Sequence, residues 1–328
     1  MAEAGEIITL DGGAWRLAAP LASSSYGIVW RATGLANGAA AALKLVNRSQ
    51  MALALPPQRE RWSACAAAEI AFLRALQPWD RRHIVRLLDS GLHEGQPAMA
   101  LELLDGDLAQ HLASLRAGGR APDCLQALDW IGQVNQALAK VHQYGWRYLD
   151  LKPSNLLLDA GRGALKLADF GTNRPLLDAT AHSYAGTAGW QAPEQVFPAG
   201  LERYRTDARS DYFVLGALLY YLVTGAVLRW CARCAQAYRE HGAAGAARLL
   251  GAHGQSEPLA PDEAALFLNH AGARGAAREA LQALLRALLA PQPEKRARHA
   301  LDISRLLGTA VAALRAQSAQ DMAQRRAA

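Results

Sequence analysis

The chain has 328 residues, 51% of them hydrophobic and 20% charged, which excludes a disordered protein and suits one bilobed or two closely packed domains. Its formal net charge of +6 is spread along the chain with no basic stripe, so nucleic-acid binding is not expected. Four cysteines are too few for a disulfide scaffold, and residues 1–13 lack the apolar run of a signal peptide, so we expect a cytoplasmic protein.

Short strands separated by turns dominate the first hundred residues. A turn is expected at residues 23–25 and a hairpin turn at 37–38. The prolines at 56–57 should break the chain, and helical spacing of apolar residues predicts a helix over 59–76. Strands are predicted over residues 10–17, 27–32, 39–46, 84–88 and 98–104.

Helices prevail after residue 105. Asp123 is the expected N-cap of a long amphipathic helix that Gly145 ends. Two short strands are predicted at 156–158 and 165–167. Helices resume after Thr206, with a Gly- and Ala-rich interruption between 242 and 275, and an Ala-rich amphipathic helix is expected after 310.

Two features of this helical half invite other readings. The most apolar stretch, Phe213 to Leu228, has 16 residues and polar members, so it predicts a buried core helix and no membrane span. Cys231 and Cys234 form a lone CxxC pair. A zinc or redox site is one reading, but two cysteines one turn apart on a helix are favoured.

Three motifs follow one another in the second half of the chain. Residues 148–155 read Y-L-D-L-K-P-S-N, residues 169–171 read D-F-G and residues 192–194 read A-P-E. In this order and at these spacings they resemble the signature of eukaryotic-type (Hanks-type) serine/threonine protein kinases, and the arginine- and alanine-rich composition suggests a bacterial member. The resemblance extends over about residues 15–310.

The resemblance implies an α+β, bilobed protein-kinase fold. Residues 1–104 would form a small β-rich N-lobe with one helix, and 105–310 a larger, mainly α-helical C-lobe. Residues 226–290 would be an extended region of that lobe, where substrates or partners dock, and 311–328 a helical tail.

The resemblance also implies ATP and Mg²⁺ as cofactors and a role for each motif residue. Asp150 would orient the acceptor hydroxyl and take its proton, while Lys152 would contact the γ-phosphate. Asn155 and Asp169 offer the oxygen ligands that Mg²⁺ prefers. Lys44, in the sequence A-A-L-K, would bind the α- and β-phosphates.

Two parts of the nucleotide site are less regular. Glu69 is the favoured partner of Lys44, with Glu60 as its rival. The family's G-x-G-x-x-G-x-V loop reads A-S-S-S-Y-G-I-V over residues 22–29, so two of its three glycines are missing and a stiffer loop is expected. The residues predicted to hold the nucleotide are Ala22, Ser24, Gly27, Val29, Ala42, Lys44, Glu102, Leu104 and Leu157.

Further residues resemble structural and regulatory positions. Asp211 would brace the catalytic-loop backbone, and Arg296 would pair with Glu194. Leu149 replaces the arginine that binds an activation-segment phosphate in many kinases, so activation through that residue is not expected. The hydroxyls between the second and third motifs include possible autophosphorylation sites, namely Thr180 and Ser183.

These residues predict an ATP- and Mg²⁺-dependent kinase that phosphorylates Ser and Thr hydroxyls of protein substrates. The pairing of Lys152 with Thr187 matches the serine/threonine-specific pattern. The alternative is a pseudokinase scaffold that binds nucleotide with little turnover. A small-molecule kinase ranks third, because such relatives generally lack the A-P-E segment. No nucleic-acid or membrane partner is expected.

Overall fold

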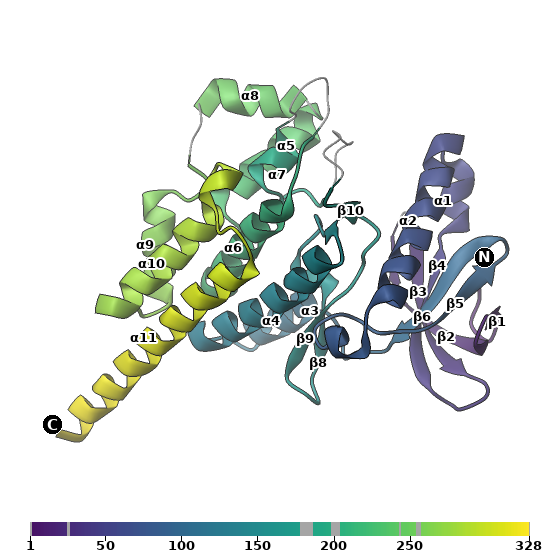
Figure 1. Cartoon of the computed structure of the whole chain (residues 1–328), viewed down its shortest axis with the longest axis horizontal. Coiled ribbons are helices and arrows are strands. Elements are labelled where there is room, and N and C mark those ends of the chain that lie inside the picture. Colours follow the sequence, from purple (N-terminus) through teal and green to yellow (C-terminus); the bar gives the residue numbers. More distant parts are fainter. Residues whose placement is uncertain are drawn as a thin grey trace. The chain divides into compact units, whose positions relative to one another are not determined.

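The chain folds into two compact units in the computed structural model (Figure 1). The structure describes residues 2–24, 27–177, 186–197, 204–242, 244–253 and 257–327. The first unit contains Met1–Asp105 and Leu157–Asn173, and the second contains Gly106–Leu156 and Arg174–Ala328. The chain therefore returns to the first unit after passing through part of the second.

A six-stranded antiparallel sheet forms most of the first unit, in the order β1-β2-β3-β4-β6-β5. Apolar side chains such as Leu17 and Leu43 form the core on this sheet. A two-stranded sheet of β8 and β9 completes the unit. The strands are β1 (Ile7–Leu10), β2 (Gly13–Ser23), β3 (Gly27–Gly34), β4 (Ala40–Val46), β5 (Leu87–His93), β6 (Gln96–Glu102), β8 (Leu156–Asp159) and β9 (Ala164–Leu167).

Several sequence predictions for this unit need correction. The strand predicted over 10–17 is two strands, because Asp11 and Gly12 turn the chain between β1 and β2. The strand predicted over 84–88 lies at Leu87–His93. Ile84 and Val85 are buried for another reason, since they run beside β9, where the Val85 amide donates to the Leu167 carbonyl at 2.9 Å.

Helices α1 (Arg48–Leu53) and α2 (Pro56–Ala75) follow the sheet's fourth strand, and the short 3₁₀ helix η1 (Pro78–Arg81) comes after them. The prolines predicted to break the chain instead begin α2. This is possible because the first turn of a helix leaves its amide groups without intrahelical acceptors, so proline loses nothing there. The predicted helix therefore starts three residues earlier than expected.

The second unit is built mainly of helices around α6 (Ala208–Thr224), whose residues are mostly buried. Helices α4 (Cys124–Gln143), α9 (Pro261–His270) and α10 (Gly275–Leu289) pack against it. The remaining elements are α3 (Leu108–Ala117), β7 (Trp146–Arg147), η2 (Pro153–Asn155), β10 (Arg174–Pro175), α5 (Pro193–Val196), α7 (Arg229–His241), α8 (Ala244–His253), η3 (Pro293–Lys295) and α11 (Ala300–Ala327).

The long-helix prediction is confirmed, and the predicted interruption is wrong. The Asp123 carboxylate accepts a hydrogen bond from the Gln126 amide at 2.8 Å and caps α4. Residues 242–275 contain α8 and α9, because alanine favours helix and Pro261 begins α9. Cys231 and Cys234 lie buried on α7 as predicted.

Gly216 lies at the closest approach of α6 and α10. A Cβ atom at this position would lie 2.7 Å from Leu288 Cβ and 2.9 Å from Leu289 Cδ2. The two helices can therefore pack this closely only because residue 216 has no side chain.

Among the described residues, no single helix is long and apolar enough to cross a membrane. Helices α6 and α7 pass such a test only when they are joined across a bend of 113°.

Candidate active site

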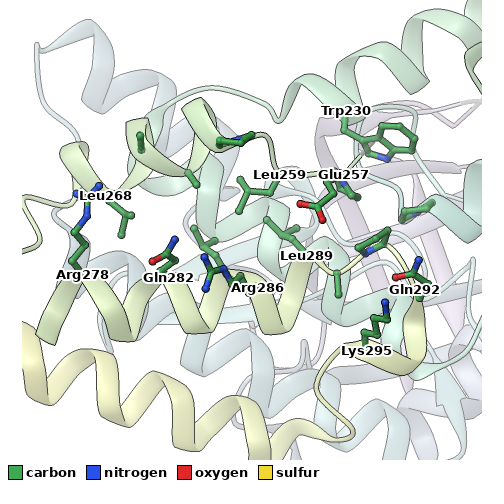
Figure 2. Close-up of a pocket in the computed structure, with 18 of the residues that line it drawn as sticks. Trp230, Glu257, Leu259, Leu268, Arg278, Gln282, Arg286, Leu289, Gln292 and Lys295 are labelled. Atoms are coloured by element: carbon green, nitrogen blue, oxygen red, sulfur yellow. The ribbon is translucent and has the colours of Figure 1, made fainter. Parts of the chain in front are cut away.

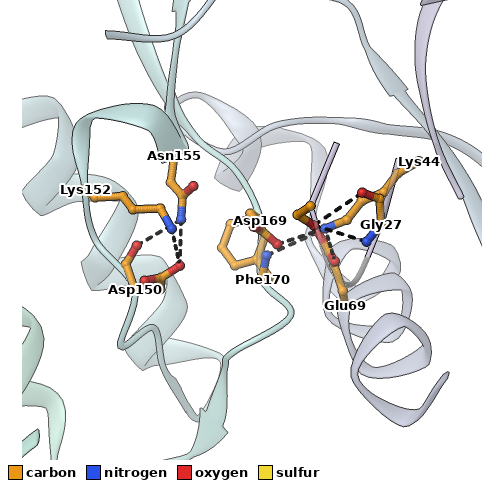
Figure 3. A network of polar contacts seen from close by, with 9 residues as sticks. Gly27, Lys44, Glu69, Asp150, Lys152, Asn155, Asp169 and Phe170 are labelled. Carbon is orange, nitrogen blue, oxygen red and sulfur yellow. Dashed lines mark hydrogen bonds and ion pairs between the residues drawn. The ribbon is translucent and has the colours of Figure 1, made fainter. Parts of the chain in front are cut away.

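Lys44, Glu69 and Asp169 form one ionic cluster in the first unit, here called the Lys44 cluster (Figure 3). The Lys44 ammonium lies 2.8 Å from Glu69 Oε2 and 2.8 Å from Asp169 Oδ1. The Glu69 side chain is 1% exposed and that of Asp169 is 50% exposed. Glu60, the rival partner, is exposed.

Helix α2 presents Glu69 because the residues beside it are buried. Ile70, Phe72 and Leu73 anchor this face of the helix in the first unit. The rings of Phe72 and Phe170 lie 4.7 Å apart, and the Phe170 amide donates to Glu69 Oε1 at 3.1 Å. Glu69 thus ties β4 to the D-F-G segment through both of its oxygens.

In the Lys44 cluster one ammonium contacts two carboxylates, and this arrangement keeps Lys44 protonated. Burial lowers the pKa of Lys44, but the charges of Asp169 and Glu69 outweigh that effect and raise the pKa above its ordinary value. Burial raises the pKa of Glu69, against the opposing effect of the Lys44 charge. Lys44 is therefore a cation over the whole physiological pH range.

The loop before β3 is closed by Ser24 and Gly27. The Ser24 amide donates to the Gly27 carbonyl at 2.8 Å, and the Gly27 amide donates to Ser24 Oγ at 3.1 Å. The Ser24 carbonyl accepts from Asn47 Nδ2 at 2.8 Å. The hydroxyl of Ser24, which replaces a glycine of the family pattern, therefore bonds to Gly27. Ser25 lies outside the described residues.

Gly27 also lies close to the lysine strand. A Cβ atom at Gly27 would approach the Leu45 carbonyl oxygen to 3.2 Å and Lys44 Cε to 3.8 Å. Across the sheet, Val29 pairs with Lys44 in β4 and with Ala22 in β2. The predicted phosphate-loop residues and Lys44 therefore belong to one local structure.

The residues predicted around the adenine ring also belong to the first unit: Val29, Ala42, Glu102, Leu104 and Leu157. The Glu102 side chain accepts from Lys166 Nζ at 2.5 Å and from the Arg86 amide at 2.8 Å. The Asp105 amide donates to the Leu158 carbonyl at 2.9 Å. These bonds fix the chain where it leaves β6.

A second cluster, here called the Asp150 cluster, lies in the second unit. Its members are Asp150, Lys152, Asn155 and Thr187, and Figure 3 labels the first three. Asp150 Oδ2 accepts from Lys152 Nζ at 2.9 Å and from Asn155 Nδ2 at 3.1 Å. Asp150 Oδ1 accepts from Thr187 Oγ1 at 2.6 Å. Lys152 Nζ also lies 2.7 Å from Thr187 Oγ1. One buried carboxylate is thus held by three donors.

The backbone before Asp150 is held in a sparsely populated conformation. Leu149 has a φ of 68°, in the left-handed region that side chains with a Cβ rarely adopt. The amides of Tyr148 and Leu149 donate to the Asp211 carboxylate at 2.9 and 2.7 Å, and the Leu149 carbonyl accepts from Gln195 Nε2 at 2.9 Å. These three bonds offset the strain and aim Asp150.

Sequence reasoning placed Asp211 in this role and missed two of its neighbours. His142 Nε2 lies 2.8 Å from Asp211 Oδ2, and its ring packs edge-on against Tyr212. Gln195, 1% exposed, follows the A-P-E motif directly. Neither residue carries a motif signal, because their roles depend on helices that meet only in the folded chain.

The structure contains the expected ion pair behind the A-P-E motif. Arg296 donates through Nη1 to Glu194 Oε1 at 2.6 Å and through Nη2 to Glu194 Oε2 at 2.9 Å. Ser210 Oγ donates to the same Glu194 oxygen at 2.7 Å. This bidentate pair joins the segment after Thr187 to the start of α6 and to η3.

Two residues predicted to bind a metal, one in each unit, carry oxygens of the kind that hard cations prefer. Asn155 uses its Nδ2 group to bond Asp150, so its carbonyl oxygen lies outside those bonds. Asp169 offers carboxylate oxygens on a half-exposed side chain, at a residue with a φ of 57°. Amide and carboxylate oxygens are the ligands that Mg²⁺ prefers. The predicted autophosphorylation sites, Thr180 and Ser183, lie outside the described residues.

Comparison with known proteins agrees with this geometry. The protein kinase domain family matches residues 17–304. Serine/threonine-protein kinase PknL of Mycobacterium tuberculosis is 33% identical over 155 residues, which cover 46% of this chain and 37% of PknL. CBL-interacting protein kinase 22 of Oryza sativa subsp. japonica is 29% identical, over 65% of this chain and 49% of its own length.

A third relative, serine/threonine-protein kinase ATG1b of Arabidopsis thaliana, is 29% identical over 65% of this chain and 28% of its own length. The chain thus matches less than half the length of each of these relatives. The strand-rich unit and the helical unit confirm the predicted α+β fold. The chain belongs to the protein kinase family, among the Hanks-type serine/threonine kinases.

Proposed function

We propose that this chain is an active serine/threonine protein kinase that transfers the γ-phosphate of ATP to protein hydroxyls in the presence of Mg²⁺. The observation that carries the proposal is the Lys44 cluster, in which one ammonium lies 2.8 Å from both Glu69 and Asp169. A scaffold that only binds partners has no need of three buried or partly buried charges in this arrangement.

Each residue then has a specific task. Asp150 orients the acceptor hydroxyl and accepts its proton, while the acceptor oxygen replaces ADP on the γ-phosphorus. Lys152 lies beside Asp150 and would steady the charge of the transferred group. Lys44 would bind the α- and β-phosphates.

Asn155 and Asp169 would hold Mg²⁺, which supplies positive charge to the phosphate oxygens when bound. Ala22, Ser24, Gly27 and Val29 would cover the phosphates. The bonds between Ser24 and Gly27 support this proposal, since they keep the loop closed where the family uses glycine. The remaining adenine-site residues would receive the base.

The experiment measures transfer of labelled γ-phosphate from ATP to a generic basic substrate protein and to the chain itself. The wild type should transfer phosphate, and Asp150→Asn and Asp169→Asn should each lose activity by about a thousandfold or more. Urea unfolding should show that both variants are folded under the conditions of the assay. Nucleotide binding by the wild type without transfer would contradict the proposal and support a pseudokinase, the second candidate favoured by Ala22 and Ser24.

We also propose that activation-segment phosphorylation does not switch this kinase on through Leu149. Its side chain is apolar and 1% exposed, so it offers a phosphate no donor. Treatment with a phosphatase should leave the transfer rate within about twofold of the untreated protein. A many-fold loss of rate would contradict this.

A further inference from the structure

The helical unit contains a pocket of about 760 Å³ among α5, α7, α9, α10 and η3 (Figure 2). Its apolar lining includes Leu268, Leu285 and Leu289. Arg278 and Trp230 lie at opposite ends of the view, with Lys295 below Trp230. The space is large enough for several side chains of a bound segment.

Three cations line this pocket and have no acidic partner among the described residues. Arg278 and Arg286 lie on α10 and Lys295 follows in η3, all with exposed side chains. No ion pair within 4.0 Å involves any of them in the described ranges, and Glu257 is the single acidic residue of the described lining. The pocket is therefore complementary to an occupant that carries negative charge.

Trp230 lines the pocket and contributes an aromatic ring to its wall. Its side chain is 6% exposed and packs against Phe197 with ring centroids 5.6 Å apart. The indole Nε1 group is buried and has no hydrogen-bond acceptor among the described residues. A buried donor without an acceptor is unfavourable, but this atom is covered by the protein itself, so an oxygen in the pocket does not reach it.

The spacing of the cations indicates the form of the occupant. Arg278 and Arg286 are eight residues apart on α10, which corresponds to about 12 Å along the helix. An extended peptide rises about 3.3 Å per residue, so about four residues span that distance. Leu285 and Leu289 lie on the same stretch of helix, where an apolar side chain of the peptide would be buried.

The pocket borders the chain segment that carries Thr187. Pro193 of the A-P-E motif lines it, and Phe197 follows directly after α5. The segment that carries Thr187, and so contacts Asp150, therefore borders the pocket.

We propose that this pocket docks an extended segment of the protein substrate in which two acidic residues, four positions apart, flank a large apolar residue. The inference rests on the proposed function, because it assigns the segment to a substrate. The acidic side chains pair with Arg278 and Arg286, and the apolar one packs on the leucine lining.

The first test is binding without nucleotide, so that it does not depend on phosphate transfer. The probe is a fluorescein-labelled synthetic peptide that contains E-A-F-A-E, measured by fluorescence anisotropy with the full chain. Peptides with K-A-F-A-K and E-A-A-A-E are the comparators. Both should bind at least about tenfold more weakly, since they lose the charge pairs or the apolar contact.

Variants then locate the binding. Arg278→Glu with Arg286→Glu should weaken the binding of E-A-F-A-E by at least about tenfold. Arg315→Glu, an exposed position on α11 outside the pocket, is the matched control and should bind like the wild type. Circular dichroism checks that each variant is folded. Equal binding of the acidic and basic peptides, or no effect of the double charge reversal, would overturn the proposal.

The second test joins E-A-F-A-E through a Gly/Ser linker to a serine acceptor peptide. In the wild type this fusion should have a KM about tenfold below that of the acceptor alone, and the double charge reversal should remove that advantage without changing kcat for the acceptor alone. Peptide binding without transfer would overturn the proposed function and the substrate assignment. Transfer without peptide binding would overturn the docking proposal alone.

Two other occupants would also overturn it. Dodecanoate that binds while the peptide does not would assign the pocket to a fatty acyl chain. A concentration-dependent dimer in sedimentation velocity that the double charge reversal dissolves would assign it to a second copy of this chain.

Discussion

The Lys44 cluster and the Asp150 cluster use the same kinds of side chain in opposite proportions. In the first unit one ammonium serves two carboxylates, and the Asp169 carboxylate is half exposed. In the second unit one carboxylate serves three donors and is buried. The first cluster therefore carries more carboxylate than ammonium charge, whereas the second holds one buried carboxylate with at least three donors.

The clusters also differ in what holds them. The Lys44 cluster joins β4, α2 and the D-F-G segment mainly through side chains. The Asp150 cluster follows a strained residue, Leu149, whose peptide groups are fixed by Asp211 and Gln195. Removing a charged side chain should therefore lower kcat most in the first cluster. Removing a residue that supports the backbone should lower kcat most in the second.

The largest expected effect comes from removing the two lysines in turn. Lys44→Met leaves two adjacent carboxylates without a cation, so kcat should fall by roughly a thousandfold. Lys152→Met leaves Asp150 with Thr187 and Asn155, so the loss should be roughly a hundredfold. Steady-state transfer at saturating ATP measures both. Equal losses would mean that the clusters do not differ in the way described above.

The next effect concerns Asp211, which supports the backbone before Asp150. Asp211→Asn replaces an acceptor of two buried amides with a group that has one acceptor oxygen, and should lower the free energy of unfolding by about 3 kcal/mol. It should also lower kcat by about tenfold or more, because Asp150 loses its support. Urea unfolding and transfer assays at a temperature where the variant is folded measure the two quantities.

Asp89 provides the matched control for Asp211. It is a buried aspartate of the first unit, whose carboxylate accepts from the Gly12 amide at 2.8 Å and from Trp15 Nε1 at 3.0 Å. Asp89→Asn should destabilise the protein to a similar extent and leave kcat within about twofold of the wild type. If the two variants lower kcat equally, loss of stability alone explains the Asp211 result.

A smaller effect is expected at Thr187, which sequence reasoning did not include among the catalytic residues. Its hydroxyl donates to Asp150 and lies beside Lys152, so Thr187→Ala should lower kcat by about tenfold. Thr187→Ser keeps the hydroxyl and should retain most of the activity. A serine variant as poor as the alanine variant would assign Thr187 a packing role.

The smallest effect concerns pH. The folded pKa of Lys44 lies above its ordinary value of 10.5, so its ion pairs contribute fully below that value and are lost only as pH rises through the raised pKa. The difference in unfolding free energy between wild type and Lys44→Met should therefore stay constant between about pH 8 and 10. A difference that shrinks over this range would show that Lys44 loses its proton earlier.

The sequence predicted the residues of both clusters because their chemistry is concentrated in short motifs. Asp150, Lys152 and Asn155 lie within six positions, and a β-strand lysine such as Lys44 needs no distant contact to be recognised. Element boundaries were predicted less well. Ile84 is apolar and buried, but its partner is β9, which is more than seventy residues away along the chain.

The supporting residues lay beyond sequence reasoning for a related reason. His142 is one polar residue near the end of an amphipathic helix, and only the packing of α4 against α6 brings it to Asp211. The helices between residues 242 and 275 were missed because alanine and glycine together give no clear apolar period. The pocket beside α10 likewise depends on tertiary packing.

The absence of a side chain at Gly216 has a consequence for how this protein tolerates mutation. In a library of single variants, position 216 should accept almost no replacement, since even alanine would overlap Leu288 and cost about 1–3 kcal/mol. Gly132, within α4, has no atom within 4 Å of an added Cβ and should accept alanine with a gain of about 0.5–1 kcal/mol. These two glycines, both within helices of the same unit, should therefore differ sharply in how well they tolerate a side chain.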